Sequence, residues 1–255
     1  NDWGKMGKAV PYNNRVLTPM LEKAAKVRER FPDMELSTSI IGPISNAVAI
    51  RPIEKVLRDT RKNPERLKEL IALAVDNSLR WVEAFTKEFG ASKVNIADPV
   101  TCTDILSRSQ FEEFSFPELK RLVSGVKEIT GLKPSLHICG HTKGIWGELK
   151  RLEISSFSVD NCEDLAELRE ALGDTMTIVG NVPPVDIFRF GSIDDVIESV
   201  KDCIQKGATS PKGYILDAGC DVPTATPKEN LDAFTYAARK YGAGAKIGEM
   251  PLGMM

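Results

Sequence analysis

The sequence has no long hydrophobic run and little net charge, and each shortage excludes a class of protein. Its apolar stretches are far shorter than the roughly 18 residues that a membrane-spanning helix requires. The net charge is -2, from 34 Lys and Arg against 36 Asp and Glu. No basic run or RNA-binding signature occurs, so nucleic acid is not expected to be the main partner. The composition is that of a globular protein outside the membrane, with 42% hydrophobic residues.

Cysteine is scarce as well, with five residues in a chain of 255. An odd number at irregular spacing does not form a disulfide framework. Reduced thiols are typical of the cytoplasm, which is the predicted location. The chain also has no Gly-x-Gly-x-x-Gly fingerprint and no phosphate-binding loop at the start of any predicted helix, so a nucleotide site has no local support.

Alternating strands and helices are what the sequence does contain, from Met34 onward. This order predicts parallel strands joined by crossover helices, an α/β fold. Apolar runs predict six strands, at residues 35–41, 93–97, 135–139, 156–159, 176–179 and 214–216. Apolar residues at helical spacing predict helices at residues 16–31, 52–60, 64–89, 115–130, 145–152, 163–172, 193–206 and 227–241. Ser115 and Ser192 stand where they can cap two of these helices.

The length of 255 residues suits a single (β/α)8 barrel, which needs eight strands. Because only six strands are predicted, we expect a TIM-type barrel whose N-terminal strand or strands are absent from this chain. Residues 1–255 are then one barrel domain, N-terminally incomplete. An open, doubly wound sheet is the alternative.

The most informative segment is His137-Ile138-Cys139-Gly140, at the end of the predicted strand 135–139. Side chains two residues apart on a strand point to the same face, so His137 and Cys139 lie together. Imidazole and thiolate together make half of a zinc site. Cys220 follows another predicted strand and becomes a third ligand if the three meet in space. Three protein ligands leave a fourth position open, as in catalytic rather than structural zinc sites.

Further polar residues follow the predicted strands. The carboxyl ends of parallel strands lie on one side of the sheet, where barrel active sites are built. The candidate catalytic or substrate-binding residues are Asp98, Asp160, Asn181 and Asp221, together with His141 in the loop after Cys139. Asp98, Asp160 or Asp221 is a candidate for a labile fourth ligand or a proton relay, and the sequence does not rank them.

Several motifs in this order resemble the zinc-dependent methyltransferase branch of the uroporphyrinogen decarboxylase superfamily. They are residues 137–142 (His-Ile-Cys-Gly-His-Thr), 178–182 (Ile-Val-Gly-Asn-Val), 219–223 (Gly-Cys-Asp-Val-Pro) and 226–230 (Thr-Pro-Lys-Glu-Asn), with Asp2-Trp3-Gly4, Asp98-Pro99 and residues 111–114 (Phe-Glu-Glu-Phe) elsewhere. The resemblance implies a TIM-type barrel with zinc held by His137, Cys139 and Cys220.

The resemblance also implies an enzyme of anaerobic one-carbon metabolism. The favoured expectation is the methyltransferase component of an O-demethylase, which moves methyl from a small donor such as a methoxylated aromatic to the cobalt of a separate corrinoid protein. Zinc there polarises the ether oxygen of the donor. The alternative is a methylcobamide:coenzyme M methyltransferase, in which zinc activates the acceptor thiol.

Two weaker alternatives remain. Decarboxylation of a porphyrinogen is disfavoured, because the decarboxylase proper uses no metal and does not carry the His-x-Cys pair that this chain has. The second of these alternatives is a non-catalytic module that binds zinc or a corrinoid. The cobalamin-binding Asp-x-His-x-x-Gly pattern is absent from the sequence, so the corrinoid is expected on a partner protein.

Overall fold

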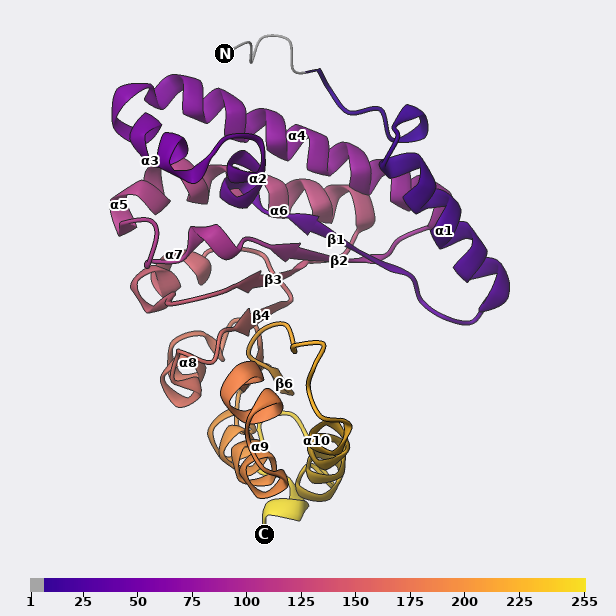
Figure 1. The fold of residues 1–255 in the computed structure, drawn as a ribbon, viewed down its shortest axis with the longest axis vertical. Helices are drawn as coiled ribbons and strands as arrows, with labels where there is room; N and C mark the ends of the chain where they lie inside the picture. Colours follow the sequence, from indigo (N-terminus) through magenta and orange to yellow (C-terminus); the bar gives the residue numbers. More distant parts are fainter. Residues whose placement is uncertain (1–6) are drawn as a thin grey trace. The chain divides into compact units, whose positions relative to one another are not determined.

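The computed structural model describes residues 7–255 (Figure 1). The chain divides into two compact units. The Asp2-Trp3-Gly4 motif lies outside the described residues. The first unit holds the chain up to Thr101 together with Ile105–Leu136 and Leu152–Ile154. The second unit holds Cys102–Asp104, His137–Arg151 and Ser155–Met255.

The first unit contains two parallel strands and most of the long helices. Its elements are α1 (Leu17–Arg30), β1 (Ser37–Ile41), α2 (Pro43–Ile50), α3 (Ile53–Lys62), α4 (Pro64–Phe89), β2 (Lys93–Ala97), α5 (Arg108–Gln110) and α6 (Phe116–Thr130). In the β1–β2 pair, Ile40 lies opposite Ile96. Both side chains are buried, which agrees with the apolar pattern that predicted the strands.

The core of this unit forms around one face of α4. Apolar residues of α4 recur every three or four positions, so they share a face of the helix. The cluster that they form with neighbouring helices and loops consists of Ile44, Ala47, Val56, Leu67, Leu70, Ile71, Leu106 and Phe114. This packing anchors the helices of the first unit.

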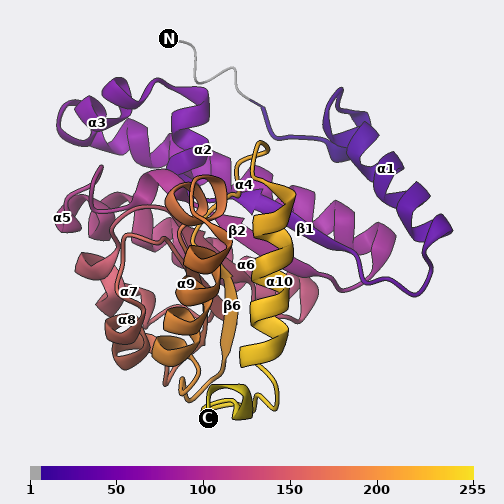
Figure 2. The same cartoon turned by 60° about the horizontal axis from the view of Figure 1, so that its bottom comes forward.

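The second unit carries the remaining alternation of strands and helices. The chain enters it through β3 (Ser135–Ile138), and the following elements are α7 (Trp146–Leu149), β4 (Ser156–Val159), α8 (Leu165–Leu172), β5 (Thr177–Val182), α9 (Ile193–Gly207), β6 (Tyr214–Ala218) and α10 (Lys228–Tyr241). Strands β4, β5 and β6 pair in parallel. Helices α9 and α10 lie side by side (Figure 2).

The α/β fold class is confirmed, with parallel strands in the order β1-β2-β3-β4-β5-β6. All six predicted strands are present, within three residues of the predicted bounds. Helix α2 was not predicted, because Gly42-Pro43 reads as the end of a strand. In the structure Pro43 occupies the first turn of α2, where its missing N–H costs no hydrogen bond.

The two predicted helix caps have different outcomes. Ser192 caps α9, and its hydroxyl accepts a hydrogen bond from the backbone N–H of Asp195. The prediction that Ser115 caps a helix is wrong, because a π-helical segment, Phe111–Ser115, continues directly into α6. The Ser115 hydroxyl is buried and pairs with the hydroxyl of Thr101 instead, at 2.9 Å.

None of the helices that residues 7–255 form is long and apolar enough to cross a membrane.

Replacing Leu67 of α4 tests the core of the first unit. Its side chain is fully buried, so Leu67→Ala is expected to lower the free energy of unfolding by about 2–5 kcal/mol through lost burial and a residual cavity. Leu132→Ala is the matched control, because Leu132 is 42% exposed, and it should change stability by about 0.5 kcal/mol or less. Urea unfolding of both variants makes the comparison, and equal destabilisation would contradict this description of the core.

Candidate metal centre

His137 and Cys139 come from β3 and the residue that follows it. Leu136 and Ile138 alternate with them and are fully buried, so the histidine and the cysteine share the opposite, partly exposed face. The Nε2 atom of His137 lies 3.2 Å from the Sγ atom of Cys139. The predicted half-site is therefore present.

Gly140 allows the chain to turn immediately after these two residues. Its φ angle is +71°, in the left-handed region that favours glycine. A Cβ atom at this position would lie 2.6 Å from a carboxylate oxygen of Asp104 and 3.1 Å from the Sγ of Cys102. Both the backbone angle and the lack of space therefore require glycine here.

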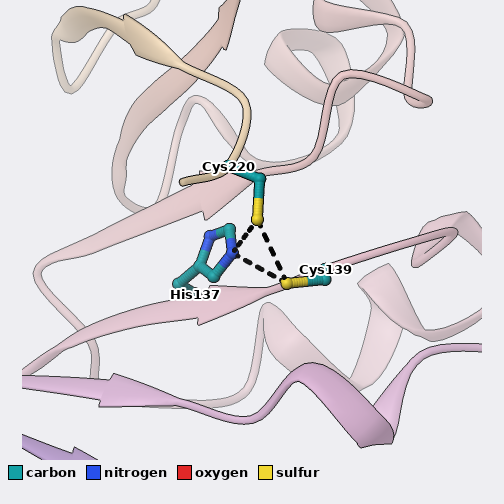
Figure 3. Close-up of side chains that lie close together, drawn as sticks. All are labelled: His137, Cys139 and Cys220. Carbon is teal, nitrogen blue, oxygen red and sulfur yellow. Dashed lines mark hydrogen bonds between the residues drawn. The ribbon is translucent and has the colours of Figure 1, made fainter. Parts of the chain in front are cut away.

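Cys220 completes a group of three. It follows β6, two residues beyond Ala218, and Gly219 packs against the backbone of Asn161. The Sγ of Cys220 lies 3.5 Å from the Sγ of Cys139 and 3.8 Å from Nε2 of His137 (Figure 3). Among residues 7–255, this is the group of three or more His, Cys, Asp or Glu side chains whose spacing suits a metal ion.

The spacing of the three atoms matches a tetrahedral zinc site. Bonds of about 2.3 Å to sulfur and about 2.0 Å to nitrogen put two sulfurs about 3.8 Å apart, and sulfur and nitrogen about 3.5 Å apart. The observed sulfur–nitrogen separations of 3.2 and 3.8 Å lie on either side of their value. The observed sulfur–sulfur separation of 3.5 Å is slightly shorter than its value. The two sulfurs are too far apart for a disulfide bond, which is about 2.05 Å long, and both cysteines are free.

The other ring nitrogen of His137 is already engaged. Its Nδ1 lies 3.1 Å from both the backbone oxygen and the hydroxyl of Ser158. Because a carbonyl oxygen only accepts hydrogen bonds, Nδ1 carries the proton and Nε2 keeps a free lone pair toward the thiols. A hydrogen bond of this kind fixes the ring and its tautomer in metal-binding histidines.

Burial shifts the pKa values of His137 and Cys139 in opposite directions, and both shifts favour the neutral side chain. Burial lowers the pKa of His137, which keeps the imidazole neutral and able to donate its lone pair. Burial and then the adjacent Cys220 thiol raise the pKa of Cys139 to about 12, so the Cys139 thiol stays protonated at neutral pH without a metal. A divalent cation reverses that preference by compensating the thiolate charge.

Asp160 and Asn181 lie in the same unit as the three donors, and both contact backbone rather than one another's side chains. Asp160 accepts hydrogen bonds from the backbone N–H of Gly140 at 2.9 Å and of Cys162 at 3.3 Å. The buried amide of Asn181 donates to the backbone oxygens of Asp160 and Glu163, at 3.2 and 2.8 Å. Both residues therefore hold the loop that follows β4.

His141 is exposed and is held by Asp104. One carboxylate oxygen of Asp104 accepts the backbone N–H of His141 at 2.8 Å, and the other contacts its ring Nδ1 at 2.9 Å. The backbone hydrogen bond, followed by the ring, lowers the pKa of Asp104, and the carboxylate raises the pKa of His141. Sequence reasoning missed Asp104, because no periodic pattern marks the loop that contains it.

The remaining two predicted residues are placed differently. Asp98 belongs to the first unit, is fully buried, and accepts hydrogen bonds from the Ser45 backbone N–H at 2.9 Å and the Thr101 hydroxyl at 3.0 Å. Burial raises the pKa of Asp98. These contacts hold the Asp98 carboxylate in the interior of its unit. Asp221 is exposed, immediately after Cys220, and its charge opposes ionisation of Cys139. Catalytic or substrate-binding roles for these residues stay predictions.

Comparison with known proteins identifies the family. The chain belongs to the uroporphyrinogen decarboxylase (URO-D) family, whose model matches residues 1–241. The resemblance stated from the sequence motifs is therefore confirmed at the level of the superfamily.

Individual relatives include both methyltransferases and decarboxylases. The chain is 27% identical over 243 residues to the methylcobamide:CoM methyltransferase MtaA of Methanosarcina barkeri, covering 93% of this chain and 68% of that protein. It is 31% identical over 188 residues to uroporphyrinogen decarboxylase 2 of Oryza sativa subsp. japonica, covering 72% of this chain and 46% of that protein.

A solved methyltransferase from Methanosarcina mazei has the same fold, with a TM-score of 0.77 at 24% identity, covering 89% of this chain and 65% of that chain. The expectation of a TIM-type barrel fold is supported by this match. The chain thus spans between about half and two thirds of the length of the proteins it matches.

Cys162 offers a test of the charge around the centre. Cys162 lies two residues after Asp160, and partial burial of its thiol, followed by the charges of Asp160 and Glu163, raises its pKa to about 12. Its alkylation by iodoacetamide should therefore rise about tenfold per pH unit between about pH 7 and 10 without levelling off. Peptide mass spectrometry follows the modification of Cys162. A plateau near the value of about 8.5 for a free thiol would contradict the combined effect of burial and acidic surroundings on this pKa.

Proposed function

We propose that this chain belongs to a zinc-dependent methyltransferase that exchanges a methyl group with the cobalt of a separate corrinoid protein. The observation that carries the proposal is the cluster of His137, Cys139 and Cys220. Its two sulfurs and one nitrogen are the donor set that zinc prefers, at tetrahedral spacing. Three donors leave one tetrahedral position for a substrate or water, as catalytic zinc requires.

The chemistry follows from that open position. Zinc bound there would act as a Lewis acid on the sulfur or oxygen atom that gains or loses the methyl group. The Ser158 carbonyl keeps Nε2 of His137 directed at the site. The thiolates of Cys139 and Cys220 reduce the net charge of the centre and make it favourable for a sulfur ligand.

A thiol acceptor is favoured over a methoxylated aromatic donor. The methyltransferase relative from Methanosarcina barkeri is named for methylcobamide and CoM, and a second similar protein, from Methanosarcina mazei, is a methylated-thiol:coenzyme M methyltransferase. Transfer of methyl from a methylcobamide to a coenzyme M-like thiol is therefore the proposed direction. The O-demethylase expected from the sequence motifs becomes the second candidate, because the two relatives named here are described by a thiol and not by an aromatic donor.

Decarboxylation remains the weaker candidate, although decarboxylases are among the relatives. A metal-free decarboxylase has no use for two free thiols and an imidazole held within 4 Å of one another. The proposed partners are a corrinoid protein and a small thiol, and a cytoplasmic location stays a prediction.

Removal of one sulfur ligand tests the proposal directly. The purified protein should contain one zinc per chain, and Cys220→Ala should lose most of it. The matched control is Cys203→Ala, because Cys203 is a buried thiol of α9 that is not part of the cluster, and its zinc content should be unchanged. Elemental analysis by mass spectrometry measures the metal in each protein.

The same three proteins are then assayed in both directions. The wild type should demethylate methylcobalamin with coenzyme M as acceptor. The activity of Cys220→Ala should fall by more than about a hundredfold, because the loss of a residue that only contacts a metal ligand already costs roughly tenfold to a hundredfold. Methylation of cob(I)alamin by methoxylated aromatics should be much slower. Full activity of protein without stoichiometric zinc would refute the metal centre, and activity only with the aromatics would reverse the direction.

A further inference from the structure

Four consecutive backbone N–H groups after Cys139 donate to carboxylates. Gly140 donates to Asp160 at 2.9 Å, and His141 donates to Asp104 at 2.8 Å. The next two N–H groups, of residues 142 and 143, both donate to one oxygen of Glu163, the second at 2.7 Å. Three acidic side chains therefore bind the backbone of one four-residue segment.

The three carboxylates come from separate places in the chain. Asp104 lies in the Cys102–Asp104 segment of the second unit, and Asp160 and Glu163 lie between β4 and α8. Glu163 is buried, at 7% exposure, and also accepts the hydroxyl of Thr142 at 3.1 Å. Hydrogen bonds to an ionised acceptor are roughly twice as strong as neutral ones. Two separate parts of the chain therefore hold residues 140–143 through strong, directional hydrogen bonds.

The carboxylates bind the backbone directly beside a proposed ligand. Asp160 accepts the N–H of Gly140, the residue that follows Cys139. Acidic groups near two thiols are favourable once a divalent cation occupies the cluster, because the cation then attracts all of them.

We propose that Asp104, Asp160 and Glu163 form a carboxylate clamp, which positions residues 140–143 for the metal centre. The clamp fixes the backbone on the carboxyl side of Cys139, so the sulfur keeps one orientation toward the ion. The clamp also fixes the imidazole of His141, because its Nδ1 lies 2.9 Å from a carboxylate oxygen of Asp104. The Nε2 atom of the ring is then directed away from that carboxylate. The three acids are positioning residues that act through Cys139 and His141. This inference rests on the proposed zinc site.

Glu163→Ala is the principal test, with Glu167→Ala as the matched control. Glu167 is only four residues away, on α8, and accepts the side-chain ammonium of Lys143 rather than a backbone N–H. Zinc affinity is measured by competition with a chromophoric chelator. Glu163→Ala should bind zinc about tenfold to a hundredfold more weakly, and Glu167→Ala should match the wild type. Glu163→Gln, whose side-chain oxygen still accepts both N–H groups, should recover part of the loss.

Cobalt substitution separates positioning from simple stability. With Co²⁺ in the cluster, the sulfur-to-metal charge-transfer and d–d bands should shift in Glu163→Ala and stay unchanged in Glu167→Ala. A variant that is merely less stable would unfold at a lower temperature with unshifted bands. Asp104→Ala, at an exposed position, supplies a second variant if Glu163→Ala does not fold, and it should shift the same bands.

The outcomes distinguish the clamp from the metal site itself. If the wild type binds neither Zn²⁺ nor Co²⁺, the proposed function fails and the clamp with it. If the wild type binds both ions while the Glu163 and Asp104 variants keep its affinity and bands, only the clamp is refuted.

Discussion

The two-residue repeat of a β-strand is the constraint on which the rest of this structure depends. It places His137 and Cys139 on one face of β3 while Leu136 and Ile138 fill the core on the other. A shift by one residue would bury the imidazole and the thiol and would expose two apolar side chains. Burial of Leu136 and Ile138 therefore secures the register of the metal ligands. One face of this short strand contributes to the hydrophobic core, and the other face contributes to the candidate metal centre.

The sequence was most informative where function depends on strand ends. Apolar runs located all six strands, and the polar residues that follow them include His137, Cys139 and Cys220, which the structure brings within 3.8 Å of one another. Strand periodicity and the common direction of parallel strands carry that information. Helix α2 escaped prediction because proline serves both to end a strand and to begin a helix.

The contacts of the carboxylate clamp were beyond sequence reasoning. Asp104 and Glu163 accept hydrogen bonds from backbone N–H groups. Because every residue type except proline supplies such a donor, no pattern of side-chain types predicts these contacts. Asp98 is a candidate site residue because of its place at the end of a strand. The structure adds its hydrogen bonds with Ser45 and Thr101, which satisfy buried backbone and hydroxyl groups of its own unit.

The donor set is the central claim of this account, and zinc-edge X-ray absorption spectroscopy of the zinc-loaded protein measures it directly. Two sulfurs at about 2.3 Å, one imidazole nitrogen at about 2.0 Å and one further light atom are predicted. Addition of coenzyme M should raise the number of sulfurs from two to three. A shell of nitrogen and oxygen only, or four sulfurs before the thiol is added, would contradict the assignment of His137, Cys139 and Cys220.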